Sequence, residues 1–194
     1  AGKDFGRYLD VDGDGIPYRT YPGTHPTRGS YFTRGTSRDR YARYSEQGEV
    51  YQDNMERLLL KWETAKGLVP QPVLKPAKRR TPDGVIYFGS TDPAMDEALA
   101  TLEKEGVYLD ALRLRAFPFP DSVFDFIRDH EQVFVVEQNR DAQMKSLLVN
   151  EGGVDPSRLV SIRHFDGNPI TARFVHSAIH EKLKAGRSIL PERA

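Results

Sequence analysis

The feature that most constrains the fold is an alternation of short apolar runs and helical segments over residues 84–185. Runs typical of buried strands cover residues 85–88, 107–113, 133–137 and 159–163, and helical patterns cover residues 93–105, 121–130, 140–150 and 171–184. Strands that alternate with helices imply right-handed crossovers, a parallel sheet and helices on both of its faces. The sequence therefore predicts an α/β domain of three layers with an open, mainly parallel sheet.

Residues 1–80 have a different character, with many Gly and Pro turns and little apolar periodicity. We expect an irregular segment with one helix, from Glu49 to Lys66, because Met55, Leu58 and Trp62 fall on one side of it. Prolines and basic residues over 70–82 predict a stiff, extended linker.

Several classes of protein are excluded by composition. The chain has no Cys, which rules out disulfides, a thiol nucleophile, cysteine-ligated zinc and a cysteine-bound iron–sulfur cluster. Its aliphatic runs are too short to cross a membrane. The N-terminus has neither an initiator Met nor the plan of a signal peptide, so we expect an interior portion of a longer, cytoplasmic protein.

Two short motifs suggest ligands but have simpler interpretations. Acids at positions 10, 12 and 14 with Gly15 match the opening of a calcium-binding EF-hand loop, but its twelfth position falls on Tyr21, so an acidic turn is favoured. The turn Gly89-Ser90-Thr91-Asp92 lies where a strand meets a helix N-terminus, which suits an anion. It lacks the residues of a nucleotide fingerprint, and such a turn is more often only a helix cap.

His176 and His180 have the i, i+4 spacing of metal ligands on a helix. The sequence offers no third ligand at the spacing of a zinc protease, and positive charge near a helix C-terminus is favourable by itself. No metal site is assigned on this pattern.

Residues 18–44 combine six Arg, no Lys and six aromatic residues. Arginine without lysine indicates bidentate recognition of carboxylate or phosphate. Interleaved aromatic residues also suit single-stranded RNA, and a surface that docks on a partner subunit is a third possibility. The zero net charge argues against nucleic acid as the partner.

Several motifs together resemble the alpha subunit of 2-oxoacid:ferredoxin oxidoreductases, the 2-oxoglutarate type in particular. They extend over nearly the whole chain and keep the family order. These motifs are Asp14-Gly15-Ile16-Pro17-Tyr18-Arg19-Thr20-Tyr21-Pro22-Gly23-Thr24, Phe88-Gly89-Ser90-Thr91-Asp92, Leu112-Arg113-Leu114-Arg115-Ala116, Val135-Val136-Glu137-Gln138-Asn139-Arg140-Asp141 and Asp166-Gly167-Asn168-Pro169-Ile170-Thr171-Ala172-Arg173-Phe174.

The resemblance implies that residues 1–80 are the end of the pyrimidine-side thiamine-diphosphate domain plus its linker. Residues 84–185 are then similar to the transketolase C-terminal domain. Such an enzyme decarboxylates a 2-oxoacid on thiamine diphosphate, passes electrons to ferredoxin and delivers the acyl group to coenzyme A. A beta subunit would supply Mg²⁺ and an iron–sulfur cluster, so this chain alone is expected to bind no cofactor and to be inactive.

The resemblance also implies where reactants lie, although it assigns no catalytic residue to this chain. Asp14 and Arg19 are expected to line or support the entrance for substrate and coenzyme A, and Arg34 to contact an anion. Candidates at the carboxyl ends of the strands, where open α/β sheets hold ligands, are Ser90, Thr91 and Arg140.

Overall fold

The computed structural model describes residues 5–27, 29–30 and 37–187, which form two units, residues 1–69 and 70–194. We call them the N-terminal and C-terminal units. Arg34 lies outside the described residues. Among the described residues, no helix is both long enough and apolar enough to cross a membrane.

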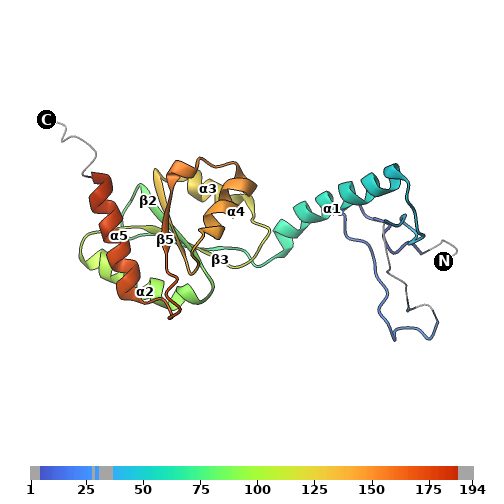
Figure 1. Ribbon diagram of the computed structural model, residues 1–194, viewed down its shortest axis with the longest axis horizontal. Coiled ribbons are helices and arrows are strands. Elements are labelled where there is room, and N and C mark those ends of the chain that lie inside the picture. Colours follow the sequence, from blue (N-terminus) through green and yellow to red (C-terminus); the bar gives the residue numbers. More distant parts are fainter. Residues whose placement is uncertain (1–4, 28, 31–36, 188–194) are drawn as a thin grey trace. The chain divides into compact units, whose positions relative to one another are not determined.

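A five-stranded sheet is the centre of the C-terminal unit (Figure 1). Its strands lie in the order β1-β3-β2-β4-β5, and all neighbours are parallel except β1 and β3. The strands are β1 Val73–Lys75, β2 Asp83–Phe88, β3 Asp110–Leu114, β4 Gln132–Glu137 and β5 Leu159–Arg163. This order and direction confirm the open, mainly parallel sheet that the sequence predicts.

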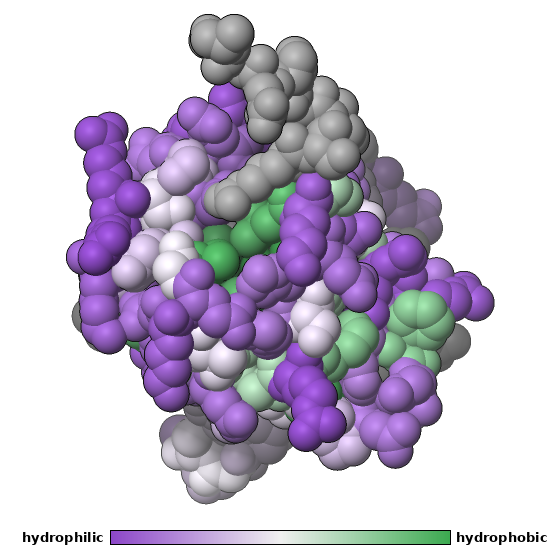
Figure 2. Space-filling model, turned by 90° about the vertical axis from the view of Figure 1, so that its left-hand side faces the viewer, coloured by the Kyte–Doolittle hydropathy of each residue, from purple (hydrophilic) through white to green (hydrophobic). Residues whose placement is uncertain are grey.

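Two helices cover each face of the sheet, which completes the three layers (Figure 1). Side chains of β4 alternate between the layers: Phe134 and Val136 face α2 and α5, whereas Val133 and Val135 face α3 and α4. The helices are α2 Asp92–Lys104, α3 Asp121–Asp129, α4 Gln143–Gly152 and α5 Ala172–Arg187. Viewed from the side of α2 and α5, the surface is mainly hydrophilic, as expected where apolar helix faces point inward (Figure 2).

The structure differs from the sequence prediction in one additional strand and in several element boundaries. Within the expected linker 70–82, Val73–Lys75 forms the edge strand β1, paired antiparallel with Ala111–Arg113. Prolines on both sides limit it to three residues, and an edge is where a sheet tolerates Pro. The start of α4 is shifted as well, because the helix begins at Gln143 and not near residue 140.

The strand β3 begins at Asp110 rather than at Val107 because α2 ends in a Schellman turn. Gly106 adopts φ 81°, its N–H donates to the Glu103 carbonyl, and the Val107 N–H donates to the Leu102 carbonyl at 2.9 Å. Val107 packs against the core as the apolar residue of this turn. Its hydrophobicity therefore serves the helix end and not a strand.

The described residues of the N-terminal unit form one helix, α1 Gly48–Leu68, and an irregular segment, as predicted. No residue of α1 is buried, and even its large apolar side chains are exposed: Leu59 is 68% exposed and Trp62 is 39% exposed. The irregular segment is attached to α1 by polar contacts: Arg57 donates to the Gly15 carbonyl at 2.9 Å, and the Thr64 hydroxyl donates to the Asp14 carbonyl at 2.6 Å.

Candidate functional site

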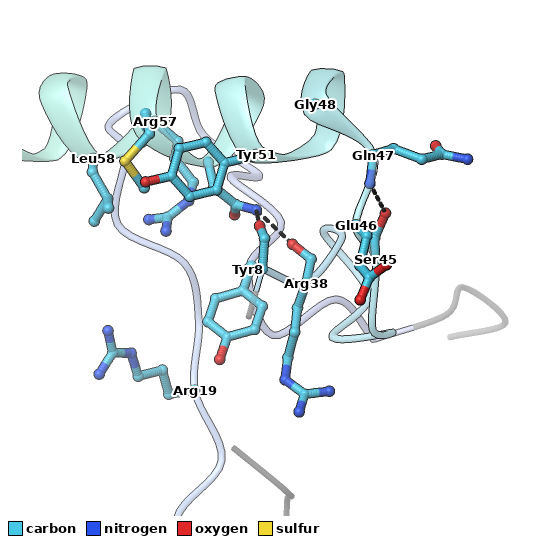
Figure 3. Close-up of a pocket in the computed structure, with 13 residues that line it drawn as sticks. Tyr8, Arg19, Arg38, Ser45, Glu46, Gln47, Gly48, Tyr51, Arg57 and Leu58 are labelled. Atoms are coloured by element: carbon cyan, nitrogen blue, oxygen red, sulfur yellow. Dashed lines mark hydrogen bonds between the residues drawn. The ribbon is translucent and has the colours of Figure 1, made fainter. Parts of the chain in front are cut away.

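A large pocket lies within the N-terminal unit, between the first half of α1 and the irregular segment (Figure 3). It has a volume of about 840 Å³. We call it the arginine pocket, because three guanidinium groups line it. The described residues that line it are Tyr8, Arg19, Ser37, Arg38, Ser45, Glu46, Gln47, Gly48, Tyr51, Asn54, Met55, Arg57 and Leu58.

The walls of the arginine pocket are tied together by Asn54 on α1. Its side-chain amide donates to the Arg38 carbonyl and to the Ser37 hydroxyl, the latter at 3.2 Å. In Figure 3 the Tyr8 ring lies between the side chains of Arg19 and Arg38, and Tyr51 extends from the helix above. Segments distant in sequence thus form one concave surface.

The three guanidinium groups differ in how they are held. Arg57 is anchored to the Gly15 carbonyl, and Arg38 donates to the Ala42 carbonyl at 3.3 Å. Arg19 is exposed and makes no hydrogen bond or ion pair with any described residue. Glu46 accepts a hydrogen bond from the Tyr44 hydroxyl and is the single acid among the described residues that line the pocket. The pocket is therefore cationic and can hold a carboxylate or phosphate between fork-shaped donors.

Asp14 does not line the arginine pocket. Its carboxylate accepts the Ile16 N–H at 2.8 Å, and its carbonyl is held by Thr64. The next residue, Gly15, has φ 77°, and a Cβ at this position would lie 2.3 Å from the backbone nitrogen of Lys61. Asp14 thus supports a turn that approaches α1 closely, upstream of Arg19.

The acidic turn 10–15 uses its carboxylates as acceptors for its own loop. Asp10 accepts the N–H groups of Gly13 and Gly15 at 2.9 and 3.0 Å, and Asp12 accepts the Tyr18 hydroxyl at 3.0 Å. These contacts are those of a turn stabilised by Asx side chains. They agree with the acidic-turn interpretation of the EF-hand-like sequence.

A second pocket, of about 490 Å³, lies at the carboxyl ends of β2 and β4. We call it the strand-end crevice. Ser90 and Thr91 line it, as predicted, and both accept hydrogen bonds from the Gln138 amide, at 3.0 and 3.2 Å. Arg140 does not line it, because its exposed side chain pairs with Asp141 at 2.7 Å. The structure thus brings two of the three predicted residues together.

The motif Glu137-Gln138-Asn139 caps α4 beside this crevice. Glu137 is fully buried, and its carboxylate accepts the N–H of Met144 at 2.8 Å and of Lys145 at 3.4 Å. Asn139 accepts the Gln143 N–H at 3.2 Å. Side chains from the end of β4 therefore satisfy the first N–H groups of α4, whose preceding residue, Ala142, provides no side-chain cap.

This arrangement occupies one of the two helix starts near the strand-end crevice. The helix N-terminus that would attract an anion already faces the Glu137 carboxylate. At the start of α2, Asp92 pairs with Lys75 at 3.4 Å and with Arg113 at 2.8 Å. Glu137 thus occupies the N–H groups at the start of α4, whereas Asp92 is neutralised by two cations and does not line the crevice.

Sequence reasoning missed most of the lining of the arginine pocket. Tyr51, Asn54, Arg57 and Leu58 recur at helical spacing, which places them on one face of α1. That spacing is the only available signal, and it does not identify Tyr8 as a neighbour across more than 40 residues of chain.

No protein-family model matches the sequence, and no curated protein matches it significantly. Among solved structures, the chain is similar to 2-oxoglutarate:ferredoxin oxidoreductase from Magnetococcus marinus, solved with 2-oxoglutarate, coenzyme A and succinyl-CoA bound. The TM-score is 0.79 at 18% identity, over 94% of this chain and 31% of that chain.

The alpha chain of a probable 2-oxoacid ferredoxin oxidoreductase from Thermoplasma acidophilum also matches, at 23% identity over 59% of this chain and 97% of that chain. Its TM-score of 0.40 is too low to support a structural argument. The chain therefore spans about a third of the Magnetococcus marinus oxidoreductase chain and has the fold of that part of it.

Proposed function

We propose that the chain is a portion of the alpha subunit of a 2-oxoacid:ferredoxin oxidoreductase, with 2-oxoglutarate as the expected substrate. Two independent observations support this: the motifs quoted above and the shared fold over 94% of the chain. The enzyme converts a 2-oxoacid and coenzyme A into an acyl-CoA and passes electrons to ferredoxin. In this proposal residues 1–80 belong to the end of the pyrimidine-side thiamine-diphosphate domain and its linker.

Within that enzyme, we assign to the arginine pocket the reception of an anionic reactant, either the 2-oxoacid carboxylate or a phosphate of coenzyme A. The observation that carries this assignment is the exposed Arg19, which has no protein partner among the described residues and faces a pocket with two further guanidinium groups. Tyr8 and Tyr51 provide flat surfaces for a planar group beside the anion.

The redox chemistry is assigned to other parts of the enzyme. An iron–sulfur cluster needs cysteine ligands, and this chain has none. Holding Mg²⁺ with a pyrophosphate requires several oxygen ligands, carboxylates above all. Among the described residues that line the arginine pocket, Glu46 is the one acid, so the pocket does not provide such a set. We therefore expect the chain alone to show no turnover with thiamine diphosphate, Mg²⁺, 2-oxoglutarate, coenzyme A and a viologen acceptor.

The test is kinetic, in the enzyme assembled from the alpha chain that carries these residues and its beta subunit. Charge-assisted hydrogen bonds contribute about 1.5–3 kcal/mol, so Arg19→Ala should lower kcat/KM for the 2-oxoacid or coenzyme A by about 10- to 150-fold. Arg19→Lys should restore part of this, because it keeps the charge and loses the fork. The matched control is Arg43→Ala, another exposed arginine of the same unit that does not line the pocket.

The outcomes separate the alternatives. Weaker subunit affinity with unchanged kinetics would make Arg19 an assembly contact and refute the reactant assignment. No turnover of any 2-oxoacid by the assembled wild-type protein would refute the family assignment itself.

A further inference from the structure

A cluster of potential metal ligands lies on the surface of the C-terminal unit, where α2 and α5 run side by side. His176 and His180 come from successive turns of α5, and Glu105 is the C-cap residue that directly follows α2. The Nε2 atoms of the two histidines lie 2.9 and 2.8 Å from the same oxygen, Oε2 of Glu105. Three ligand atoms thus converge on one point.

The position of these three side chains is fixed by the core beneath them. Met95 and Leu102 of α2 are buried against Val175 and Ile179 of α5, so the two helices cannot move apart without exposing that core. The Schellman turn at Gly106 fixes the backbone of Glu105. The cluster is therefore held by packing and does not depend on the ligands' own contacts.

This ligand set has a defined preference. Two imidazole nitrogens and one carboxylate oxygen suit Zn²⁺ and the neighbouring first-row cations, whereas Ca²⁺ and Mg²⁺ prefer oxygen ligands alone. The i, i+4 histidine pair supplies two adjacent corners of a tetrahedron, and the exposure of the cluster leaves a corner for water.

We propose that His176, His180 and Glu105 form a binding site for a divalent first-row transition metal ion, Zn²⁺ in particular. The third ligand that the sequence could not identify is supplied by a residue 71 positions before His176. Glu105 marks the end of α2, and the strand-end crevice adjoins its start, about 20 Å away at 1.5 Å per residue. The ion thus joins the end of α2 to α5, at the opposite end of α2 from the strand-end crevice.

Metal binding is measured on the intact chain, freed of any affinity tag, by calorimetry with Zn²⁺ and by visible absorption with Co²⁺. We expect one ion per chain, a rise in Tm with Zn²⁺, and Co²⁺ bands that Zn²⁺ abolishes. The absence of Cys excludes thiolate ligands as a source of those bands. Mutation of a residue that only hydrogen-bonds to a metal ligand weakens metal affinity about 10- to 100-fold. Because His176 and His180 would be ligands themselves, His176→Ala and His180→Ala should each weaken Zn²⁺ affinity by about 100-fold or more.

Matched controls keep the result decisive. His25→Ala removes an exposed histidine of the other unit and should leave Zn²⁺ affinity unchanged. Glu105→Gln keeps the size and a hydrogen-bonding oxygen but should still weaken binding, and circular dichroism verifies that each variant is folded. Wild-type binding that requires millimolar Zn²⁺, or Zn²⁺ affinity that survives in a folded His176→Ala/His180→Ala double variant, would overturn the proposal.

Discussion

Removal of the Glu137 carboxylate should be among the most damaging single changes in the C-terminal unit. This side chain is fully buried, and it accepts the Met144 N–H at 2.8 Å and the Asn139 side-chain amide at 2.7 Å. A third contact, from the Lys145 N–H, is longer at 3.4 Å. In Glu137→Ala these partly buried donors lose their acceptor.

The expected magnitude follows from those contacts. A hydrogen bond to a charged group contributes about 1.5–3 kcal/mol, and two short ones are lost, so the free energy of unfolding should fall by about 3–6 kcal/mol. Domains of this size are stable by about 5–15 kcal/mol, so much of the stability is at risk. Glu137→Gln keeps one carbonyl oxygen but turns an amide donor toward a backbone N–H, and should lose about 1.5–3 kcal/mol.

The assay is urea unfolding followed by far-UV circular dichroism, with hydrogen exchange of the β4 amides to report on the C-terminal unit. Fluorescence of Trp62 is unsuitable, because the single Trp lies in the other unit. The control is Glu151→Ala, which removes an exposed side chain of α4 that makes no hydrogen bond or ion pair with a described residue, and it is expected to change stability by about 0.5 kcal/mol or less. If Glu137→Ala unfolds within about 1 kcal/mol of that control, the capping argument is wrong.

Three further predictions concern stability. His130→Ala should lower the free energy of unfolding by about 2–4 kcal/mol in urea, because the buried ring lies between the Phe126 carbonyl, at 2.6 Å, and the Asp110 carboxylate, at 3.1 Å. Gly15→Ala should destabilise the N-terminal unit more than Gly13→Ala in thermal unfolding. Both glycines have positive φ, but only a Cβ at residue 15 would clash with the Lys61 backbone. Equal losses of stability in the two variants would contradict the close approach of this turn to α1. Hydrogen bonds from the Ser157 side chain and N–H lower the pKa of Asp155. The stabilisation from this carboxylate is therefore present above its unfolded pKa of about 3.9 and is lost as the pH falls through the lower folded value. The free energies of unfolding of Asp155→Asn and wild type should thus differ by a constant amount above about pH 5 and converge below pH 4.

The strands and helices of residues 84–185 could be predicted because their periodicity is local. The strand β5 was predicted with its observed bounds, and α3 within one residue at each end. The start of β3 was not, because whether Val107 begins a strand or ends a helix depends on a turn geometry that hydrophobicity does not reveal. The strand β1 has three residues between prolines and is defined only by its partner β3.

The candidate site could be predicted less well than the fold. Arg19 was identified from a motif, and Ser90 and Thr91 from their place after a strand. The arginine pocket itself depends on contacts between α1 and residues near Tyr8, which no local pattern encodes. The role of Glu137 was missed for the same reason, since a carboxylate at the end of one strand caps a helix that begins six residues later.

The short strand β1 has a consequence for self-association. A sheet edge can template the addition of a strand from another molecule, and long, flat edges are the most exposed to this. At the β1 edge, Pro70, Pro72 and Pro76 have no N–H to donate, and only three residues are available to pair. Growth of the sheet by a second copy is therefore disfavoured on this side, and β5, beside which no other described strand lies, is the more open edge.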